Sequence, residues 1–540
     1  MTETDATKLS KTATLPEGEL ASFPGESLQG AEENVMTGAR ALTVLLVSAL
    51  SASSAAQQAS PVPREVIVSV PRAVDRPGVE AFVARGGGRV VDELPALGLL
   101  LVAVPEGISA EAAATRLASV PGVRHADVNG WGRGGDFPVN DTFFADLWHL
   151  DNRGQSGGTP GADIEALRAW ELTRGSPAVR VAVLDSGIGM NHPEFAGRIL
   201  PGFDFWNNDD NPQDDHGHGT MVSSLLAANA DNAFGVAGVD HQCLLIPVKV
   251  LNQFNGGSTF ALAQGLVFAA DAGADVISMS LINYPSSPSL REALQYARDA
   301  GCVLVACGGN GGIGDADQTF PGRSPLVIEV GATTAFDERA WFSGTGERLD
   351  VVAPGDLVPA MTYSPAEQLV LFSGCSAATP VVSGIVALLL SVDPTLTHDE
   401  VQALLQDNAD DQVGPAEFDL PGRDDHYGYG RVNAFRSLCG LDDNVPILVA
   451  PDVIHVDGAP GSVLSATDPL VMQAFASVRA FDDLDPHPTI GFRMPGTFTY
   501  GRAASVSIVA RDACGNEVMK SVEVVVNPPA PARAGKVTSR

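Results

Sequence analysis

The sequence predicts an α/β protein with a doubly wound parallel sheet, preceded by a small α+β domain and followed by a small all-β sandwich. Its 540 residues are too many for one hydrophobic core. Between residues 140 and 435, segments that are apolar on both faces alternate with helical segments, which is typical of a parallel sheet covered on both sides. The expected strands include 179–184, 244–250, 276–280, 303–306 and 326–330.

The region from Glu65 to Asn129 has a different pattern. Four short apolar segments have the pattern of strands. Two further stretches have the pattern of helices: one is apolar and ends before three glycines, and the other is rich in Ala. The order is βαββαβ, which predicts a small ferredoxin-like unit. The expected strands are 66–70, 89–94, 98–104 and 123–128, and the expected helices are 79–84 and 109–120.

The pattern changes again after Gly440. From Pro446 to Asn527 the chain has short alternating segments with Pro and Gly turns, and a helix is indicated only near 468–474. This predicts a small antiparallel sandwich. Residues 528–540 are rich in Pro and Ala and are expected to be disordered.

The N-terminal segment is typical of an exported protein. The apolar stretch 41–50 is too short to span a bilayer, follows Arg40 and precedes small residues. Because the first 35 residues are polar and acidic, we expect Met36 to be the initiator and cleavage to follow Ala56. Secretion and a mature chain without a membrane span are therefore expected, with a polar linker over 57–62.

Charge excludes one large class of partner. The chain has 65 Asp and Glu against 33 Lys and Arg, a net charge of −32. Nucleic acid is not an expected partner, because neutralising phosphates requires a basic patch. The acidity indicates either calcium binding or solubility alone.

Six cysteines are too few for a disulfide scaffold in a chain of this length. Cys243, Cys302 and Cys307 lie in apolar or Gly-rich segments, which predicts small buried side chains. A bridge between Cys439 and Cys514 stays an open alternative.

Three segments carry candidate catalytic residues. Asp185 ends a buried strand, at the sheet edge where α/β proteins place their sites. Residues 214–220 read Asp-Asp-His-Gly-His-Gly-Thr and place His218 at the start of an apolar helix. Ser376 follows Gly374 at the start of a second apolar helix, whose free N–H groups can hold an oxyanion. Each alone has a plainer interpretation: a turn Asp, a metal site at the two His, and an N-cap Ser.

The order Asp, His, Ser, each with its glycine neighbours, resembles the subtilisin-like serine peptidases. Further segments resemble the same family, both around Asn310 and near the start of the region. They are 140–141, 148–152, 161–164, 169–170, 305–310, 320–322, 327–332 and 351–355.

The resemblance implies that the protein cleaves proteins or peptides and that no metal takes part in the chemistry. His218 would activate Ser376, Asp185 would orient His218, and Asn310 would hold the oxyanion. A monomer is expected. Substrate would lie against Ser280, Leu281, Ile282, Gly308 and Gly309.

The resemblance extends to the rest of the chain. The N-terminal unit resembles the family's inhibitory prodomain, with a separate small domain as the alternative, and its cleavage is expected between Asn129 and Asn140. The C-terminal unit resembles a hyalin-repeat-like or other immunoglobulin-like module, through residues 446–447, 450–451, 482–485 and 512–516. Its expected role is adhesion or substrate targeting.

A structural calcium ion is also implied by the resemblance. Asp141, Glu194 and Asn232 match its oxygen-ligand positions, although Glu194 replaces the usual Asp. The alternative is that each is a solvated loop residue.

Three residues depart from the family pattern. Cys375 replaces the usual Thr before Ser376, Ala377 the usual Met after it, and Ile282 the usual Gly in the substrate-binding strand. We expect Ile282 to favour small side chains before the cleaved bond. Cys375 is expected to be a free thiol that is either reactive or an inert buried spacer. A binding protein without activity is the alternative function.

The expected domain limits follow from these patterns: 1–35 outside the native chain, 36–56 signal peptide, 63–130 prodomain, 136–440 peptidase domain, 445–527 C-terminal module and 528–540 tail.

Overall fold

The structure is a computed structural model that describes residues 61–527, except for 71–75, 95–97, 106–107, 109, 131–138, 316–318, 365, 367 and 443. The expected signal peptide, initiator, tail and most of the expected cleavage segment lie outside the described residues. The chain divides into two compact units, with the boundary between Phe137 and Pro138.

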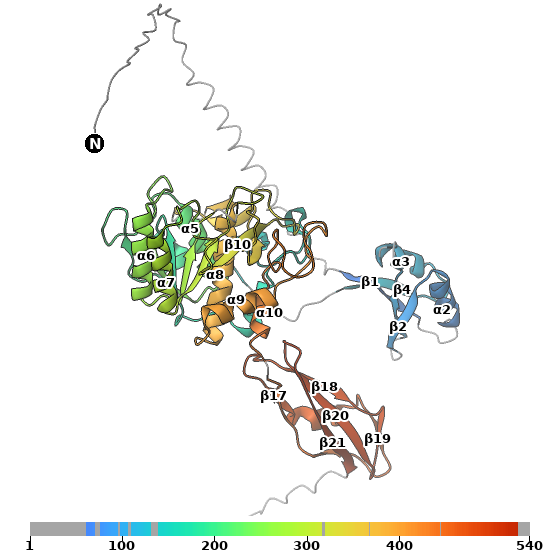
Figure 1. Cartoon of the computed structure of the whole chain (residues 1–540). Coiled ribbons are helices and arrows are strands. Elements are labelled where there is room, and N and C mark those ends of the chain that lie inside the picture. Colours follow the sequence, from blue (N-terminus) through green and yellow to red (C-terminus); the bar gives the residue numbers. More distant parts are fainter. Residues whose placement is uncertain are drawn as a thin grey trace, which may run out of the picture. The chain divides into compact units, whose positions relative to one another are not determined.

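The N-terminal unit has the predicted βαββαβ order (Figure 1). Its antiparallel sheet has the strand order β2-β3-β1-β4, as expected for a ferredoxin-like unit. β1 begins at Pro61, so the last two residues of the expected linker belong to a strand. The elements are β1 (Pro61–Ser69), α2 (Arg76–Arg85), β2 (Arg89–Leu94), β3 (Leu99–Ala103), α3 (Ala110–Ala118) and β4 (His125–Gly130).

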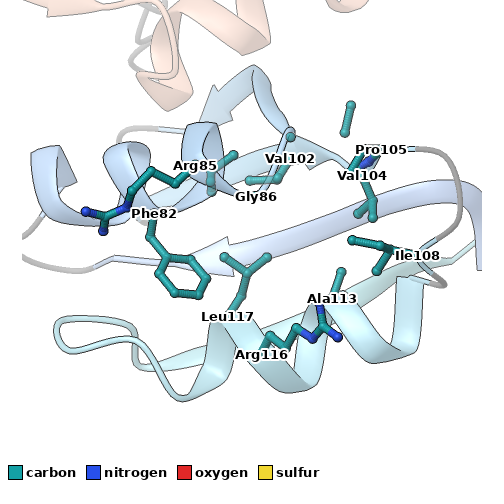
Figure 2. A pocket seen from close by; sticks show the side chains of 13 residues that line it. Phe82, Arg85, Gly86, Val102, Val104, Pro105, Ile108, Ala113, Arg116 and Leu117 are labelled. Atoms are coloured by element: carbon teal, nitrogen blue, oxygen red, sulfur yellow. The ribbon is translucent and has the colours of Figure 1, made fainter.

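The core of this unit lies between the sheet and its two helices. The sheet contributes the buried side chains of Val66, Val68 and Val102 to this core, and the helices contribute those of Val79 and Leu117. A pocket of about 350 Å³ remains between α2, α3 and the end of β3, and the close-up shows Phe82 and Leu117 beside it (Figure 2). The helices therefore leave part of the apolar interior uncovered.

The second unit contains a seven-stranded sheet in the order β11-β10-β9-β8-β5-β7-β6. All its strand pairs are parallel, and most strand residues are buried, as the apolar segments predict. Its strands are β5 (Arg180–Asp185), β6 (Phe203–Asp204), β7 (Leu244–Lys249), β8 (Val276–Met279), β9 (Val303–Cys307), β10 (Ile328–Thr333) and β11 (Val351–Pro354).

The sheet separates two apolar cores. Helices α5 (His218–Ala227) and α8 (Cys375–Val392) pack into one core, and α6 (Thr259–Asp271) and α7 (Pro288–Asp299) into the other. The predicted doubly wound architecture is thus confirmed. The remaining elements are η1 (Phe144–Asp146), η2 (Gln155–Gly157), α4 (Ala166–Leu172), η3 (Pro193–Phe195), β12 (Val358–Met361), β13 (Leu369–Phe372), α9 (His398–Asp407) and α10 (Ala434–Cys439).

Helix α8 is long and apolar enough to cross a membrane, but 89% of the helix is buried inside the domain. An apolar helix of this kind is hydrophobic on all sides because protein surrounds it. It is the central helix of the larger core.

The C-terminal module is β-rich, as predicted, and has a helix where the sequence indicates one. Its main sheet has the order β15-β21-β20-β18. β15 pairs with β21 in parallel, so the prediction of a purely antiparallel module is wrong at that pair. β15 is the first strand of this sheet along the chain and β21 is the last, and the two run in the same direction. The elements are β14 (Ile447–Val449), β15 (Val453–Asp457), β16 (Val463–Ser465), α11 (Pro469–Ala474), η4 (Phe475–Ser477), β17 (Arg479–Phe481), β18 (Thr489–Arg493), β19 (Thr497–Thr499), β20 (Ala503–Arg511) and β21 (Glu517–Asn527).

The disulfide left open by the sequence is present. Cys439, the last residue of α10, is bonded to Cys514 in the turn between β20 and β21. Cys243 and Cys302 are free and buried, as predicted.

Candidate active site

The candidate residues gather where neighbouring parallel strands end. Asp185 is the last residue of β5, and Ser280 and Asn310 follow β8 and β9. Because β5, β8 and β9 are adjacent in the sheet, their carboxyl ends open onto the same crevice. Ser280 to Ile282 lie beyond the end of β8, so the sequence interpretation of these residues as a strand is wrong.

Asp185 holds the ring of His218. Its Oδ1 lies 2.7 Å from His218 Nδ1, and both side chains are buried. His218 is the first residue of α5, which follows Gly217 with a φ of +107°, a conformation that favours glycine. At Gly219 a Cβ atom would overlap the Gly187 carbonyl oxygen, so the helix can approach β5 only because this residue is glycine.

Ser376 lies in the first turn of α8. Its hydroxyl donates to the Ser280 carbonyl oxygen at 3.4 Å rather than to His218, and Ser280 Oγ donates to the Ser376 carbonyl at 3.0 Å. Catalytic hydrogen bonds are often long without substrate, so this geometry is compatible with activation by His218. These contacts join the end of β8 to the start of α8.

Asn310 faces the same helix start. Its Oδ1 accepts the Cys375 N–H at 2.8 Å, which fixes the orientation of the side-chain amide. The amide nitrogen and the Ser376 N–H then remain as donors, because N–H groups of a first helical turn have no partner within the helix. Two donors of this kind can hold a developing oxyanion.

Asp214 is a functional residue that the sequence reasoning missed. Its buried carboxylate accepts hydrogen bonds from Ser186 Oγ, from two backbone N–H groups of the loop, and from both the N–H and the hydroxyl of Thr220. It therefore ties the segment after β5 to the loop that begins α5. The signal available in the sequence was an acidic residue just before a Gly-rich loop.

The metal-site interpretation of the two His is not supported. Asp214 is occupied by these hydrogen bonds, and Asp215 Oδ1 lies 2.7 Å from the buried Lys249 Nζ. His218 uses Nδ1 for Asp185. The neighbouring acids are therefore occupied by protein partners.

The pKa of His218 reflects opposing effects. Burial alone lowers it, but the charges of Asp185 and Asp214, with the Asp185 hydrogen bond, outweigh burial and raise the pKa above its ordinary value. The carboxylates therefore make the ring a stronger base.

Among the expected substrate-binding residues, Ser280 contacts Ser376. Leu281 is buried and Ile282 half-buried, beyond Ser280. Gly308 and Gly309 are buried and precede Asn310. Gly309 has a φ of +104°, and a Cβ there would overlap Asp315, so the segment requires glycine.

Cys375 is not a free thiol. It is bonded to Cys307, the last residue of β9, with a Cα–Cα distance of 5.3 Å. The expectation of a free Cys375 thiol, whether reactive or inert, is therefore wrong, and Cys307 is buried as predicted but is bonded. The two residues are 68 positions apart and meet only because β9 ends beside the start of α8.

Asp141, Glu194 and Asn232 lie together, as the calcium interpretation requires. Asn232 Nδ2 donates to Glu194 Oε2 at 3.0 Å, and Asp141 lies close enough for its charge to act on Glu194. Burial raises the pKa of Glu194 to about 8, and Asp141 Oδ1 is buried without a hydrogen-bond partner. The buried carboxylates of Asp141 and Glu194, with the unpartnered Asp141 Oδ1, fit a bound cation. Asn232 does not present its oxygen to Glu194 but its amide nitrogen, which is not a ligand for calcium.

The chain is similar to known peptidases over this region. Residues 176–430 match the Subtilase family, and residues 48–129 match the fervidolysin N-terminal prodomain. Thermitase from Thermoactinomyces vulgaris is 35% identical over 275 residues, covering 51% of this chain and 93% of the relative. Subtilisin DY from Bacillus licheniformis is 35% identical, covering 47% and 89%. A solved protease from Pseudoalteromonas arctica PAMC 21717 aligns with a TM-score of 0.50 and 28% identity, covering 56% of this chain and 99% of the other.

Replacing Cys307 should leave Cys375 as a free thiol next to Ser376 in the chain. In Cys307→Ser, a methylthiolating reagent should modify Cys375 once the unreduced protein is denatured, because the fold buries this side chain completely. Peptide mass spectrometry should find Cys375 unmodified in the parent chain and in the control Cys302→Ser, treated in the same way. Modification of Cys375 in the unreduced parent chain would contradict the bond.

Asp214→Asn should lower the pKa of His218, because it removes a nearby negative charge that raises this pKa. NMR titration of the His218 ring, assigned with His218→Ala, measures this pKa. Asp210→Asn removes an exposed charge as a matched control and should leave it unchanged. An unchanged or higher pKa in Asp214→Asn would show that Asp214 does not act on His218.

Proposed function

This chain belongs to the subtilase family of serine peptidases, and we propose that it hydrolyses peptide bonds in proteins through a covalent acyl-enzyme on Ser376. The observation that carries the proposal is the 2.7 Å contact between Asp185 and His218 at the start of α5, with Ser376 in the first turn of α8, which packs against α5. Asp185, His218, Ser376 and Asn310 are its proposed catalytic residues.

The proposed reaction uses each group for a different task. His218 removes the Ser376 proton as the hydroxyl attacks the substrate carbonyl, and Asp185 stabilises the imidazolium that forms. Asn310 and the Ser376 N–H hold the negative oxygen of the tetrahedral intermediate. His218 then gives its proton to the leaving amine, and water releases the acyl group by the same steps.

The N-terminal unit acts as an intramolecular inhibitor in this proposal, so the protein is made as a self-inhibited precursor. Its match to a peptidase prodomain and its ferredoxin-like sheet support that role. Cleavage between Asn129 and Asn140 separates it, and the mature enzyme is a secreted monomer over 136–440 with the C-terminal module attached. That module serves adhesion or substrate targeting.

Calcium has a structural role in this proposal. Asp141 and Glu194 bind it, with Asn232 beside them, and the ion takes the place of the proton that burial favours on Glu194. The buried, unpartnered Asp141 Oδ1 supports this assignment.

A fluorophosphonate probe should label Ser376 in prodomain-free protein, because only an activated serine attacks it readily. Labelling should be lost in Ser376→Ala and should fall by roughly a thousandfold or more in His218→Ala. Ser383→Ala, in the same helix, is the matched control and should label normally. Absence of label in folded parent protein would favour the alternative of a binding protein without activity.

Ile282→Gly should broaden the side chains accepted before the cleaved bond. The half-buried Ile282 narrows the crevice, and forcing a large group against it costs roughly 1–3 kcal/mol. A peptide-library profile of the parent should favour small residues, and that of Ile282→Gly should gain Phe and Tyr. A parent profile dominated by Phe or Tyr would contradict this assignment.

A further inference from the structure

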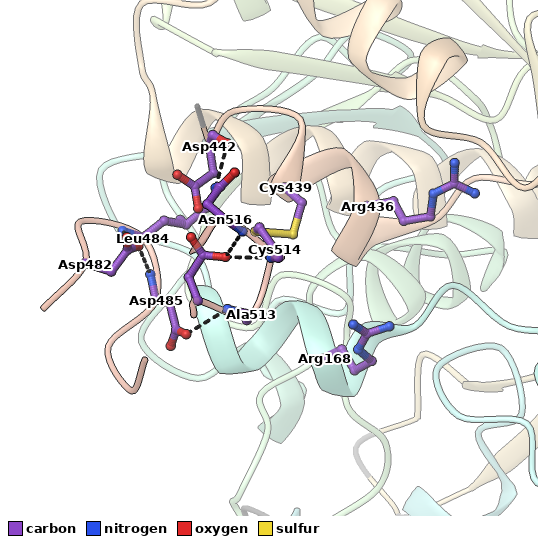
Figure 3. Close-up of a disulfide and its surroundings, with 12 residues drawn as sticks. Arg168, Arg436, Cys439, Asp442, Asp482, Leu484, Asp485, Ala513, Cys514 and Asn516 are labelled. Atoms are coloured by element: carbon purple, nitrogen blue, oxygen red, sulfur yellow. Dashed lines mark hydrogen bonds between the residues drawn. A yellow bond between two sulfur atoms is a disulfide. The ribbon is translucent and has the colours of Figure 1, made fainter. Parts of the chain in front are cut away.

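Two segments of the C-terminal module, 482–485 and 512–516, carry aspartates that the proposed hydrolysis does not use. The structure brings them to Asp442, which follows α10 at the end of the peptidase domain (Figure 3). Carboxylate oxygens of Asp442, Asp482 and Asp483 all lie within 4.8 Å of one another. Asp512 is near enough for its charge to act on Asp442.

Three carboxylate oxygens of this cluster have no hydrogen-bond partner. Asp442 Oδ2, Asp482 Oδ2 and Asp512 Oδ2 are buried without a hydrogen bond, whereas the Oδ1 atoms of the same residues accept backbone N–H groups. Asp442 is only 8% exposed and Asp512 only 4%. Buried, unpaired carboxylate oxygens are costly unless a cation or proton accompanies them.

A basic side chain does not supply that charge. Within the described parts of the chain, none of Asp442, Asp482, Asp483 and Asp512 forms an ion pair. Asp483 is exposed, and Asn444 Nδ2 donates to its Oδ2 at 2.9 Å. The cluster is therefore open to solvent on one side, through which an ion can enter.

We propose that Asp442, Asp482, Asp483 and Asp512 bind a calcium ion at the junction of the peptidase domain and the C-terminal module. Calcium takes several carboxylate oxygens in flexible geometry, whereas magnesium requires a stricter octahedron and keeps more of its water. Ligands from three separate segments suit the larger ion.

The ion would brace the junction together with two other connections. The Cys439–Cys514 bond joins the end of α10 to the turn that follows Asp512 (Figure 3). Asn516 Nδ2 from the same turn donates to the Asp442 carbonyl at 3.1 Å. Calcium therefore fixes the module to the domain at the point where the chain passes from one to the other.

Calcium binding to the full chain tests the proposal, with Ser376→Ala as the background so that the protein cannot cleave itself. Calorimetric titration after chelation should show one bound calcium fewer in Asp482→Asn/Asp512→Asn. The matched control Asp457→Asn, an exposed acid of the same module, should lose none. Asp141→Asn should remove a different calcium, so the junction site is measured separately from the peptidase-domain site.

A milder variant covers the case in which the double variant misfolds. Asp483→Asn changes an exposed ligand and should weaken the junction site by roughly tenfold while circular dichroism stays unchanged. In the background chain, calcium but not equimolar magnesium should protect 440–447 from added protease. Unchanged calcium number and affinity in folded Asp483→Asn and Asp482→Asn/Asp512→Asn, or equal protection by magnesium, would overturn the proposal.

Discussion

The hydrogen bond between Asp185 and His218 constrains the surrounding structure, because its partners come from a strand end and a helix start 33 residues apart. The strand fixes Asp185, but a Gly-rich loop alone would leave His218 free to move. The buried Asp214 carboxylate removes that freedom by bonding both to Ser186, next to Asp185, and to Thr220 in the first turn of α5. The same charge also raises the pKa of His218. Asp185 and, to a smaller extent, Asp214 therefore set both the position and the basicity of the ring.

A second set of contacts fixes the start of α8 against the sheet. The Ser280 hydroxyl, the Asn310 amide and the Cys307–Cys375 bond reach it from the ends of β8 and β9. A Thr at position 375 would contribute a hydroxyl to this region, whereas the cysteine contributes a covalent link. Two neighbouring strands and one helix are thereby held together around Ser376, which suits a site that must be ordered before substrate arrives.

The sequence predicted most of the fold because its signals are local. Buried strands such as β5 and β9 are short apolar segments, and Asp185, His218 and Ser376 each stand beside glycines that mark a turn. Contacts between distant segments could not be predicted in this way. The Cys307–Cys375 bond, the parallel pairing of β15 with β21, and the meeting of Asp442 with Asp512 depend on which segments the fold makes neighbours. Asp214 was missed because its role appears only when its hydrogen-bond partners are known.

We propose that Ser376, activated by His218, makes this chain a peptidase whose first cut is in its own precursor. Intact-mass measurement of the chain made in a protease-free translation system tests this claim most directly. The parent chain should separate into two products by a cut between Asn129 and Asn140, and Ser376→Ala and His218→Ala should remain uncut. Equal cleavage of the parent and Ser376→Ala chains at that position would contradict the account.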